Sequence, residues 1–183
     1  MKNLKNWDKK TWLSSARYIA SLILFLEKRV KFNKETKILD IGCGRGKIIS
    51  TLSKKYKMKN LPLGIDIVNH RNIEKKIKFN RINALKYLEK TKEKFDIIFF
   101  KQSIHFFSFV EIKKILKYSK KRLNHKGKII ILTLDSKKNH WPLFKAFKLK
   151  LIDSLKKDEK ILNIIKIFFK ENKINYFAFK VKI

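Results

Sequence analysis

The chain has 183 residues, of which 47 are Lys or Arg and 15 are Asp or Glu, so its formal net charge is +32. This length suits one domain of ordinary size. Hydrophobic residues make up 44% of the chain, which excludes a fully disordered protein despite the charge. The single cysteine, Cys43, excludes an internal disulfide, and no Cys/His spacing indicates a zinc site. We therefore expect a protein of the reducing cytoplasm.

The positive charge has two interpretations that stay open. Basic proteins often bind nucleic acid through its phosphates. However, only six of the 47 basic residues are Arg, which leaves 41 Lys, and nucleic-acid readers favour the bidentate guanidinium. The lysines are spread along the chain with many Ile, Asn and Phe residues, a composition that drift in an AT-rich genome would produce. Nucleic acid is thus a possible partner but not the favoured one.

The predicted elements begin with an amphipathic helix over residues 11–30. Its longest apolar stretch, residues 18–26, is about half the length that a bilayer requires, so we expect no membrane span. Short apolar, β-branched runs follow at 37–41, 61–66, 77–82, 95–100 and 128–134. These runs are nearly continuous rather than alternating, which is typical of strands buried on both faces of a parallel sheet.

Segments with helical spacing separate the strands. The clearest covers residues 110–123, with apolar residues at i, i+3 and i+4, and Asn124 and Gly127 can end it. The alternation of strands and helices predicts an α/β fold, a Rossmann-like, doubly wound and mostly parallel sheet with helices on both faces.

The last part of the chain has a different pattern. Residues 141–155 and 159–170 have helical spacing, and residues 174–183 form one alternating strand. We therefore expect a shortened C-terminal strand region with a single final strand. No repeat and no Gly/Ser or Pro linker interrupts the chain, so residues 1–183 are predicted to form one domain.

Residues 38–49 have the pattern of a buried strand, a glycine turn and a helix start. A P-loop is excluded because Ile48, not Ser or Thr, follows Lys47. A dinucleotide fingerprint is disfavoured because Lys47 stands where its third glycine is required. The remaining pattern suits a nucleoside with an amino-acid tail rather than a pyrophosphate. It consists of an acid and three alternating glycines, Asp40, Gly42, Gly44 and Gly46.

With this motif the sequence resembles the class I S-adenosylmethionine-dependent methyltransferases, in particular their small-molecule branch, over residues 35–135. The resemblance implies S-adenosyl-L-methionine as cofactor, with Asp40 helping to hold its methionine ammonium group. It also implies that the loop residues lie beside the ribose and amino-acid portion: Gly42, Cys43, Gly44 and Gly46. Cys43 stands where the family often has a small residue, and methyl transfer needs no enzyme thiol.

The similarity continues after the second and third predicted strands. In the family an acid at the place of Asp66 accepts hydrogen bonds from both ribose hydroxyls, a role that suits the two carboxylate oxygens. Ile67 follows it as a further candidate contact. Asn83 stands where the family often has an Asp near the adenine amino group, and Ala84 follows it. Asn83 suits the N-cap of the next helix equally well, and both roles can coexist.

Residues 95–106 resemble the family's fourth strand and the loop over the methyl group. The resemblance makes Gln102 a candidate cofactor contact and His105 a candidate catalytic residue. An imidazole can take a proton from an acceptor near neutral pH, and the alternative for His105 is a satisfied histidine at a helix start. Residues 123–130 resemble the family's turn into the fifth strand, without its proline and one of its glycines.

The resemblance also assigns roles to three parts of the domain. Residues 1–34 would form a helical lid, residues 35–135 the cofactor-binding core, and residues 136–183 the substrate-side helices and final strand. Trp12 in the first part and Trp141 in the last are candidates for lid and acceptor pocket, or for plain packing.

The predicted function is therefore transfer of a methyl group to a small-molecule acceptor by in-line displacement. The signature of base-amino methyltransferases is absent, because Lys101, Gln102 and Ser103 stand in its place. Two alternatives remain open. One is an RNA-directed methyltransferase that uses the basic surface, and the other is a cofactor-binding protein without catalysis, which the short C-terminal strand region would favour. The oligomeric state is left open.

Overall fold

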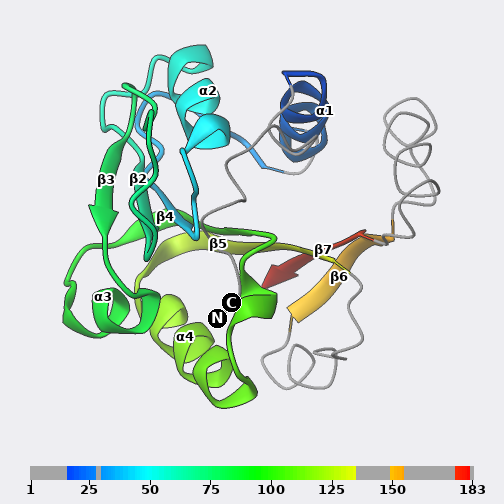
Figure 1. The fold of residues 1–183 in the computed structure, drawn as a ribbon. Helices are drawn as coiled ribbons and strands as arrows, with labels where there is room; N and C mark the ends of the chain where they lie inside the picture. The colour runs from blue at the N-terminus through cyan, green and yellow to red at the C-terminus, as the bar shows by residue number, and fades with distance from the viewer. Residues whose placement is uncertain (1–15, 28–29, 135–148, 155–175, 182–183) are drawn as a thin grey trace.

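A computed structural model describes residues 16–27, 30–134, 149–154 and 176–181 (Figure 1). Its elements are, in chain order, α1 Ala16–Glu27, β1 Ile38–Ile41, α2 Lys47–Lys55, β2 Leu63–Asp66, β3 Lys78–Arg81, α3 Ala84–Lys90, β4 Phe95–Lys101, the 3-10 helix η3 Ile104–Phe106, α4 Phe109–Lys121, β5 Leu123–Leu134, β6 Leu149–Ser154 and β7 Tyr176–Val181. Among the described residues, no helix is long and apolar enough to cross a membrane.

The strands form one sheet in the order β3-β2-β1-β4-β5-β7-β6. The first five of these are mutually parallel, whereas β7 runs antiparallel to both β5 and β6. The expected mostly parallel, doubly wound α/β sheet is thus confirmed.

Two hydrophobic cores lie on opposite faces of the sheet, one under α1 and α2 and the other under α3 and α4 (Figure 1). Neighbouring residues of β4 alternate between them: Ile97 and Phe99 belong to the α1/α2 core, and Ile98 and Phe100 to the α3/α4 core. Burying one such side chain stabilises the fold by about 1.5–3 kcal/mol. Because both faces are covered, the inner strands β1, β2 and β4 need nearly continuous apolar runs, which is the pattern seen in the sequence. The expectation that the run over 77–82 is also buried on both faces was wrong, because β3 lies at the edge of the sheet and its residues are mostly exposed.

The helix α4 begins with a capping box and ends earlier than expected. The Ser108 hydroxyl accepts a hydrogen bond from the backbone N–H of Glu111, whose side chain in turn accepts one from the N–H of Ser108. The expectation that Asn124 and Gly127 end this helix was wrong, because both lie within β5. The register between β4 and β5 shifts near Gly127, where a Cβ would lie 2.9 Å from the carbonyl oxygen of Phe95. The glycine thus serves close strand packing.

The expected single final strand was also wrong. The structure has two C-terminal strands, because residues 149–154 form β6 inside the segment expected to be a helix over 141–155. The sequence Leu-Lys-Leu-Ile-Asp-Ser is a short apolar run whose spacing fits either a strand or a helix, and pairing with β7 decides the outcome. The strand expected over 174–183 is confirmed as β7. The helix expected over 159–170 lies outside the described residues.

The N-terminal helix expected over 11–30 is described as α1, and it packs into the α1/α2 core through Ile19, Leu22, Ile23 and Leu26. This part of the chain therefore covers the sheet. Trp12 and Trp141 lie outside the described residues.

Candidate functional site

The carboxyl ends of the parallel strands carry the predicted site residues. The sheet continues from β1 to β2 and β3 on one side and to β4 and β5 on the other, so the chain reverses its winding between β1 and β4. Ligands of open α/β sheets bind outside the carboxyl ends of the strands at such a reversal. Asp40, Asp66 and Gln102 lie at or next to the ends of β1, β2 and β4, as the sequence predicted.

The loop after β1 is held to both neighbouring strands. The backbone N–H of Gly42 donates to the carbonyl of Ile65 at 2.9 Å, and the hydroxyl of Ser103 donates to the carbonyl of Ile41 at 2.5 Å. Gly42 has a φ of 73°, and a Cβ there would overlap the Cβ of Ser103. Only glycine fits this close approach.

The next two glycines differ in what surrounds them. Gly46, with a φ of 76°, is the N-cap of α2, and a Cβ there would overlap the side chain of Ile77. Gly44, with a φ of 56°, has no atom within 4 Å of the position that a Cβ would occupy. The loop therefore leaves open space beside Gly44, where a ligand can approach its backbone.

Cys43 is a packing residue in this loop. A Cβ added to Gly64 of β2 would lie 2.6 Å from its sulfur, so the missing side chain of Gly64 makes room for the thiol. Burial raises the pKa of the Cys43 thiol, and the nearby carboxylates of Asp40 and Asp66 raise it further. The thiol stays protonated, which agrees with the expectation that it is no nucleophile.

Asp66 connects the glycine loop to the end of β2. Its Oδ2 accepts a hydrogen bond from the backbone N–H of Gly44 at 2.9 Å, and its Oδ1 accepts one from Val68 at 3.0 Å. Burial opposes ionisation of Asp66, but His70 and these two N–H groups outweigh it and hold the pKa of the carboxyl below its ordinary value. Asp66 is therefore an ionised acceptor, and its Oδ1 keeps a second lone pair for a hydroxyl donor.

His70 is a site residue that the sequence analysis left out. Its Nε2 lies 3.4 Å from Oδ2 of Asp66, and both side chains are largely buried. The separation of four residues between an acid and a histidine was visible in the sequence. It carried no signal because the segment from residue 67 to residue 77 is neither a helix nor a strand.

Asp40 lies deeper than Asp66. Its side chain is 3% exposed, and among the described residues no donor reaches its Oδ1. Burial raises the pKa of Asp40 to about 7, although the charge of Lys101 opposes this rise, and the charge of Asp66 adds to it. A buried acceptor without a donor is costly unless a ligand supplies the donor.

Asn83 caps α3, as one of its two expected roles requires. Its Oδ1 accepts hydrogen bonds from the backbone N–H groups of Leu85 at 2.9 Å and Lys86 at 3.2 Å. The segment lies beside Asp66, because the N–H of Ile82 donates to the Asp66 carbonyl at 2.9 Å. Ala84 is buried under the start of α3. The contact of Asn83 and Ala84 with adenine stays a prediction.

The loop after β4 completes the edge of the site. Gln102 is buried with a φ of 55°, and its backbone N–H donates to the carbonyl of Leu132 at 2.6 Å. His105 lies on η3, where its ring is 4.2 Å from the ring centre of Phe106. The contact between Gly42 and Ser103 brings this loop against the glycine loop.

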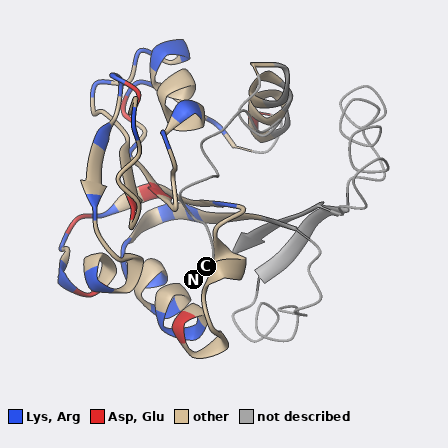
Figure 2. Cartoon of the chain, viewed as in Figure 1, with Lys and Arg blue, Asp and Glu red and all other residues tan. Residues whose placement is uncertain are grey.

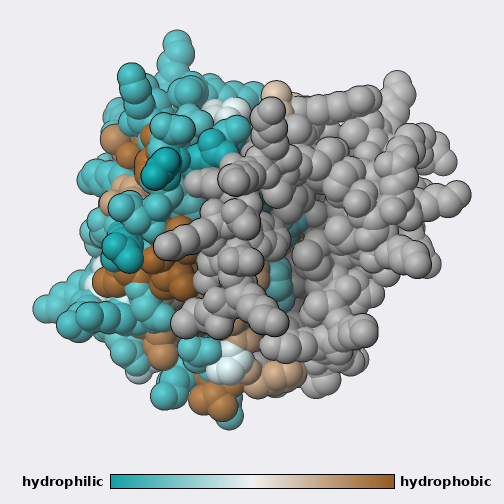
Figure 3. Space-filling model, viewed as in Figure 1, coloured by the Kyte–Doolittle hydropathy of each residue, from teal (hydrophilic) through white to brown (hydrophobic). Residues whose placement is uncertain are grey.

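Large apolar side chains are exposed next to these polar groups. Ile67, directly after Asp66, is 49% exposed, and Phe106 is 54% exposed. Figure 3 shows an area of hydrophobic residues bordered by hydrophilic ones on one face of the molecule. Exposed apolar residues beside convergent polar groups are typical of a ligand site.

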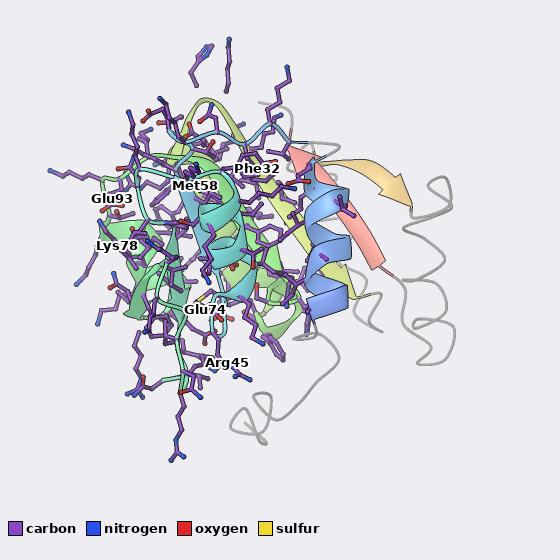
Figure 4. All side chains as sticks on the ribbon, turned by 90° about the horizontal axis from the view of Figure 1, so that it is seen from above. Phe32, Arg45, Met58, Glu74, Lys78 and Glu93 are labelled. Atoms are coloured by element: carbon purple, nitrogen blue, oxygen red, sulfur yellow. The ribbon has the colours of Figure 1, made fainter. Side chains whose placement is uncertain are left out.

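A contact between Glu74 and Arg45, which the sequence did not reveal, joins the segment after β2 to the glycine loop. The backbone N–H of Glu74 donates to the carbonyl of Arg45 at 3.1 Å, and Oε2 of Glu74 accepts a hydrogen bond from the Ser50 hydroxyl at 3.3 Å. Figure 4 shows Arg45 and Glu74 near one end of α2 and Met58 near the other. The segment between β2 and β3 therefore supports the glycine loop.

These residues fit a nucleoside with a charged amino-acid end. Asp66 offers an ionised carboxylate, Gly44 leaves space beside the backbone, and Asp40 offers a buried acceptor that lacks a donor. Within the described part of the chain, no three His, Cys, Asp or Glu side chains are grouped to hold a metal ion.

Comparisons with known proteins agree with this geometry. A family model described as a methyltransferase domain matches residues 12–177. No curated protein matches the chain. A solved S-adenosylmethionine-dependent methyltransferase from Archaeoglobus fulgidus is similar with a TM-score of 0.66 and 16% identity, over 92% of this chain and 95% of that one.

Two further solved structures are similar over most of this chain. An S-adenosylmethionine-dependent methyltransferase from Geobacter sulfurreducens, in complex with S-adenosyl-L-homocysteine, has a TM-score of 0.57 and 11% identity, over 92% of both chains. The geranyl diphosphate C-methyltransferase from Streptomyces coelicolor A3(2) has a TM-score of 0.60 and 10% identity, over 90% of this chain and 79% of that one. Since the matched family covers most of the chain and the fold is shared, the chain belongs to the class I S-adenosylmethionine-dependent methyltransferases.

Proposed function

We propose that this methyltransferase transfers a methyl group from S-adenosylmethionine to a small-molecule acceptor, and that it acts in the cytoplasm. The main support for the cofactor site is the hydrogen bond from the Gly44 N–H to the Asp66 carboxylate. It places an ionised acceptor beside a glycine whose backbone a ligand can approach. The cofactor supplies a sulfonium-bound methyl group that is already activated for displacement.

The residues of this chain would bind and orient the cofactor. Asp66 accepts the two ribose hydroxyls, and Asp40 accepts the ammonium group of the methionine portion. The remaining predicted contacts come from four short segments: Gly42, Cys43, Gly44 and Gly46 in the glycine loop, Ile67 after β2, Asn83 and Ala84 after β3, and Gln102 after β4. Because the methyl group is activated by the cofactor, the protein contributes mainly alignment and exclusion of water.

His105 is the proposed catalytic residue for an acceptor that must lose a proton. It lies on η3, directly after the β4 loop that contacts Gly42, and the exposed ring of Phe106 stands beside it. The imidazole would hold the proton released by the acceptor hydroxyl or amine. Replacement of His105 by Asn is expected to lower methyl transfer while S-adenosylhomocysteine affinity stays unchanged, and an equal loss of both would contradict this role.

A small-molecule acceptor is supported by the apolar side chains around the site and by a structural relative whose acceptor is geranyl diphosphate. The RNA alternative draws on the basic surface. Figure 2 shows Lys and Arg on β3, α2, α3 and α4 alike rather than on one stripe, which favours compositional drift. A flat dependence of RNA affinity on salt would dispose of phosphate-driven binding.

The non-catalytic alternative loses one of its two supports, and the turn into the fifth strand that lacks a proline and a glycine stays as the other. The lost support is the single C-terminal strand, because the structure has both β6 and β7. One domain over residues 1–183 stays proposed, with residues 136–183 on the acceptor side and residues 1–34 as a lid. For residues 16–27 the packing of α1 into the α1/α2 core favours the plain-packing alternative.

The test is calorimetric titration with S-adenosylmethionine, S-adenosylhomocysteine and NADH, followed by transfer of a labelled methyl group to small-molecule and RNA fractions of a cell extract. We expect micromolar binding of the first two ligands, none of NADH, and label in the small-molecule fraction that Asp66→Ala abolishes. Binding without label in any fraction would support the non-catalytic alternative, and no binding would refute the proposal.

A further inference from the structure

A lysine lies beside the buried acid of the site, on the same face of the sheet. Asp40 of β1 pairs in register with Phe99 of β4, and Lys101 is the last residue of β4, two positions further along. Side chains two positions apart in a strand point to the same face. Ile97 and Phe99 belong to the α1/α2 core, so Asp40 and Lys101 both point to the α1/α2 side.

The charges of the two groups act on each other. Burial lowers the pKa of Lys101, the charge of Asp40 raises it again, and that of Lys47 at the start of α2 lowers it. Lys101 likewise opposes the rise in the pKa of Asp40. A buried acid and lysine are on average no more stabilising than apolar residues of the same size, so the fold alone gives little reason for the pair.

The pair also lies where a ligand can reach it. Asp40 and Lys101 are at the carboxyl ends of β1 and β4, the two strands between which the winding of the sheet reverses. The glycine loop starts two residues after Asp40, and Gly44 in this loop faces open space. Oδ1 of Asp40 lacks a donor among the described residues, so the acid has bonding capacity left for a ligand.

An acid and an ammonium group side by side match the two charges of an α-amino acid. We propose that Lys101 binds the α-carboxylate of the cofactor's methionine portion while Asp40 binds its α-ammonium group, so that the pair selects ligands with an intact amino-acid end. This inference rests on the proposed function, because it assigns a further residue to the same cofactor site.

The test compares three ligands that share one nucleoside, by calorimetry on the full chain. They are S-adenosylhomocysteine, its decarboxylated analogue and 5′-methylthioadenosine, which lacks the whole amino-acid end. A charge-assisted hydrogen bond to the carboxylate predicts that the wild type binds S-adenosylhomocysteine about 10- to 100-fold more tightly than the decarboxylated analogue. In Lys101→Met this preference is expected to disappear, while the affinity for 5′-methylthioadenosine, which lacks the amino-acid end, stays unchanged.

Two variants complete the design. Lys101→Arg keeps the charge and is expected to keep part of the preference, and Lys78→Met removes an exposed lysine from the edge strand β3 and should change nothing. Lys101→Gln serves as a polar replacement if the Met variant does not fold, with methylthioadenosine binding as the check on folding.

The outcomes distinguish a failure of the Lys101 inference from a failure of the proposed function. An equal loss of affinity for all three ligands in Lys101→Met and Lys101→Gln would show that Lys101 only supports the fold, and an unchanged preference would show that it does not contact the carboxylate. Either result overturns the inference and leaves the proposed function intact. If the wild type binds none of the three ligands, the proposed function itself fails.

Discussion

The carboxylate of Asp66 accepts a hydrogen bond from the backbone N–H of Gly44 at 2.9 Å, across a separation of 22 residues. This bond fixes the tip of the glycine loop against the end of β2. The same carboxylate would accept the ribose hydroxyls, so the loop and the ribose subsite are positioned by one side chain. Changes at either residue should therefore affect cofactor binding and local stability together.

Replacement of Asp66 by Ala removes the acceptor of two backbone N–H groups and the proposed ribose ligand. We expect the affinity for S-adenosylhomocysteine to fall by about 10- to 100-fold and the free energy of unfolding to fall by about 1–3 kcal/mol. Calorimetry and urea unfolding measure the two effects. Glu35→Gln is the control. Glu35 is an exposed acid in the segment before β1, and its ion pair with Lys59 lies at the surface. An Asp66→Ala protein with wild-type affinity would contradict the ribose assignment.

The glycine loop offers a matched pair of variants. Gly42→Ala places a Cβ against Ser103 and imposes a side chain on a φ of 73°, whereas Gly44→Ala meets no atom and only has to accept a φ of 56°. The left-handed backbone costs about 1–2 kcal/mol, and the overlap at Gly42 adds about 1–3 kcal/mol. Unfolding should therefore show a larger loss of stability in Gly42→Ala.

Gly44→Ala should weaken ligand binding although it costs less stability than Gly42→Ala. The methyl group of Gly44→Ala enters the open space beside the loop, so S-adenosylhomocysteine affinity should fall by about tenfold or more even though the protein stays folded. Wild-type affinity in folded Gly44→Ala would mean that the ligand does not approach this part of the backbone.

Asp40→Asn is expected to stabilise the free protein and to weaken cofactor binding. Burial raises the pKa of Asp40 from its ordinary 3.8 to about 7. The folded protein therefore holds this proton more tightly than the unfolded chain, and the resulting stability is present below pH 4 and is lost as the pH rises through 7. At pH 8 the variant should be more stable than the wild type by about 1–4 kcal/mol.

The measurement is the free energy of unfolding of the wild type and Asp40→Asn between pH 4 and 8, with exposed Glu93→Gln as control. The two curves should approach each other toward pH 4. A constant difference across this range would show that Asp40 does not titrate as described. Cofactor affinity should fall in Asp40→Asn above pH 7, where Asp40 of the wild type is ionised, because the amide cannot pair with an ammonium group as a carboxylate does.

The sequence predicted the parts of the site that are local in the chain. Asp40, the three glycines and Asp66 follow short apolar runs, and strand ends in a parallel sheet must meet at one edge. The N-cap role of Asn83 could be predicted equally well, because an N-cap depends on the next three residues only. These features need no knowledge of which strands are neighbours.

The features that were missed depend on long-range pairing or on irregular backbone. Lys101 lies beside Asp40 only because β4 pairs with β1 in one particular register. His70 meets Asp66 through a bend in a segment without regular structure. The sequence predicts a helix where β6 lies, because a run of six residues fits either spacing until β7 offers its backbone hydrogen bonds.

His70→Ala is expected to make cofactor binding more sensitive to acid. Burial opposes ionisation of Asp66, and His70 is the largest of the contacts that outweigh it. Without the imidazole, the pKa of Asp66 should rise toward its ordinary value or above it, so protonation would remove the ribose acceptor at a higher pH than in the wild type. Calorimetric titration with S-adenosylhomocysteine from pH 3 to 8, a range that includes the ordinary pKa of 3.8 for Asp66, should show affinity falling earlier on the acid side in the variant. His125→Ala is the matched control, because His125 is exposed in β5. Parallel pH profiles for the wild type and His70→Ala would show that His70 packs against Asp66 without tuning its charge.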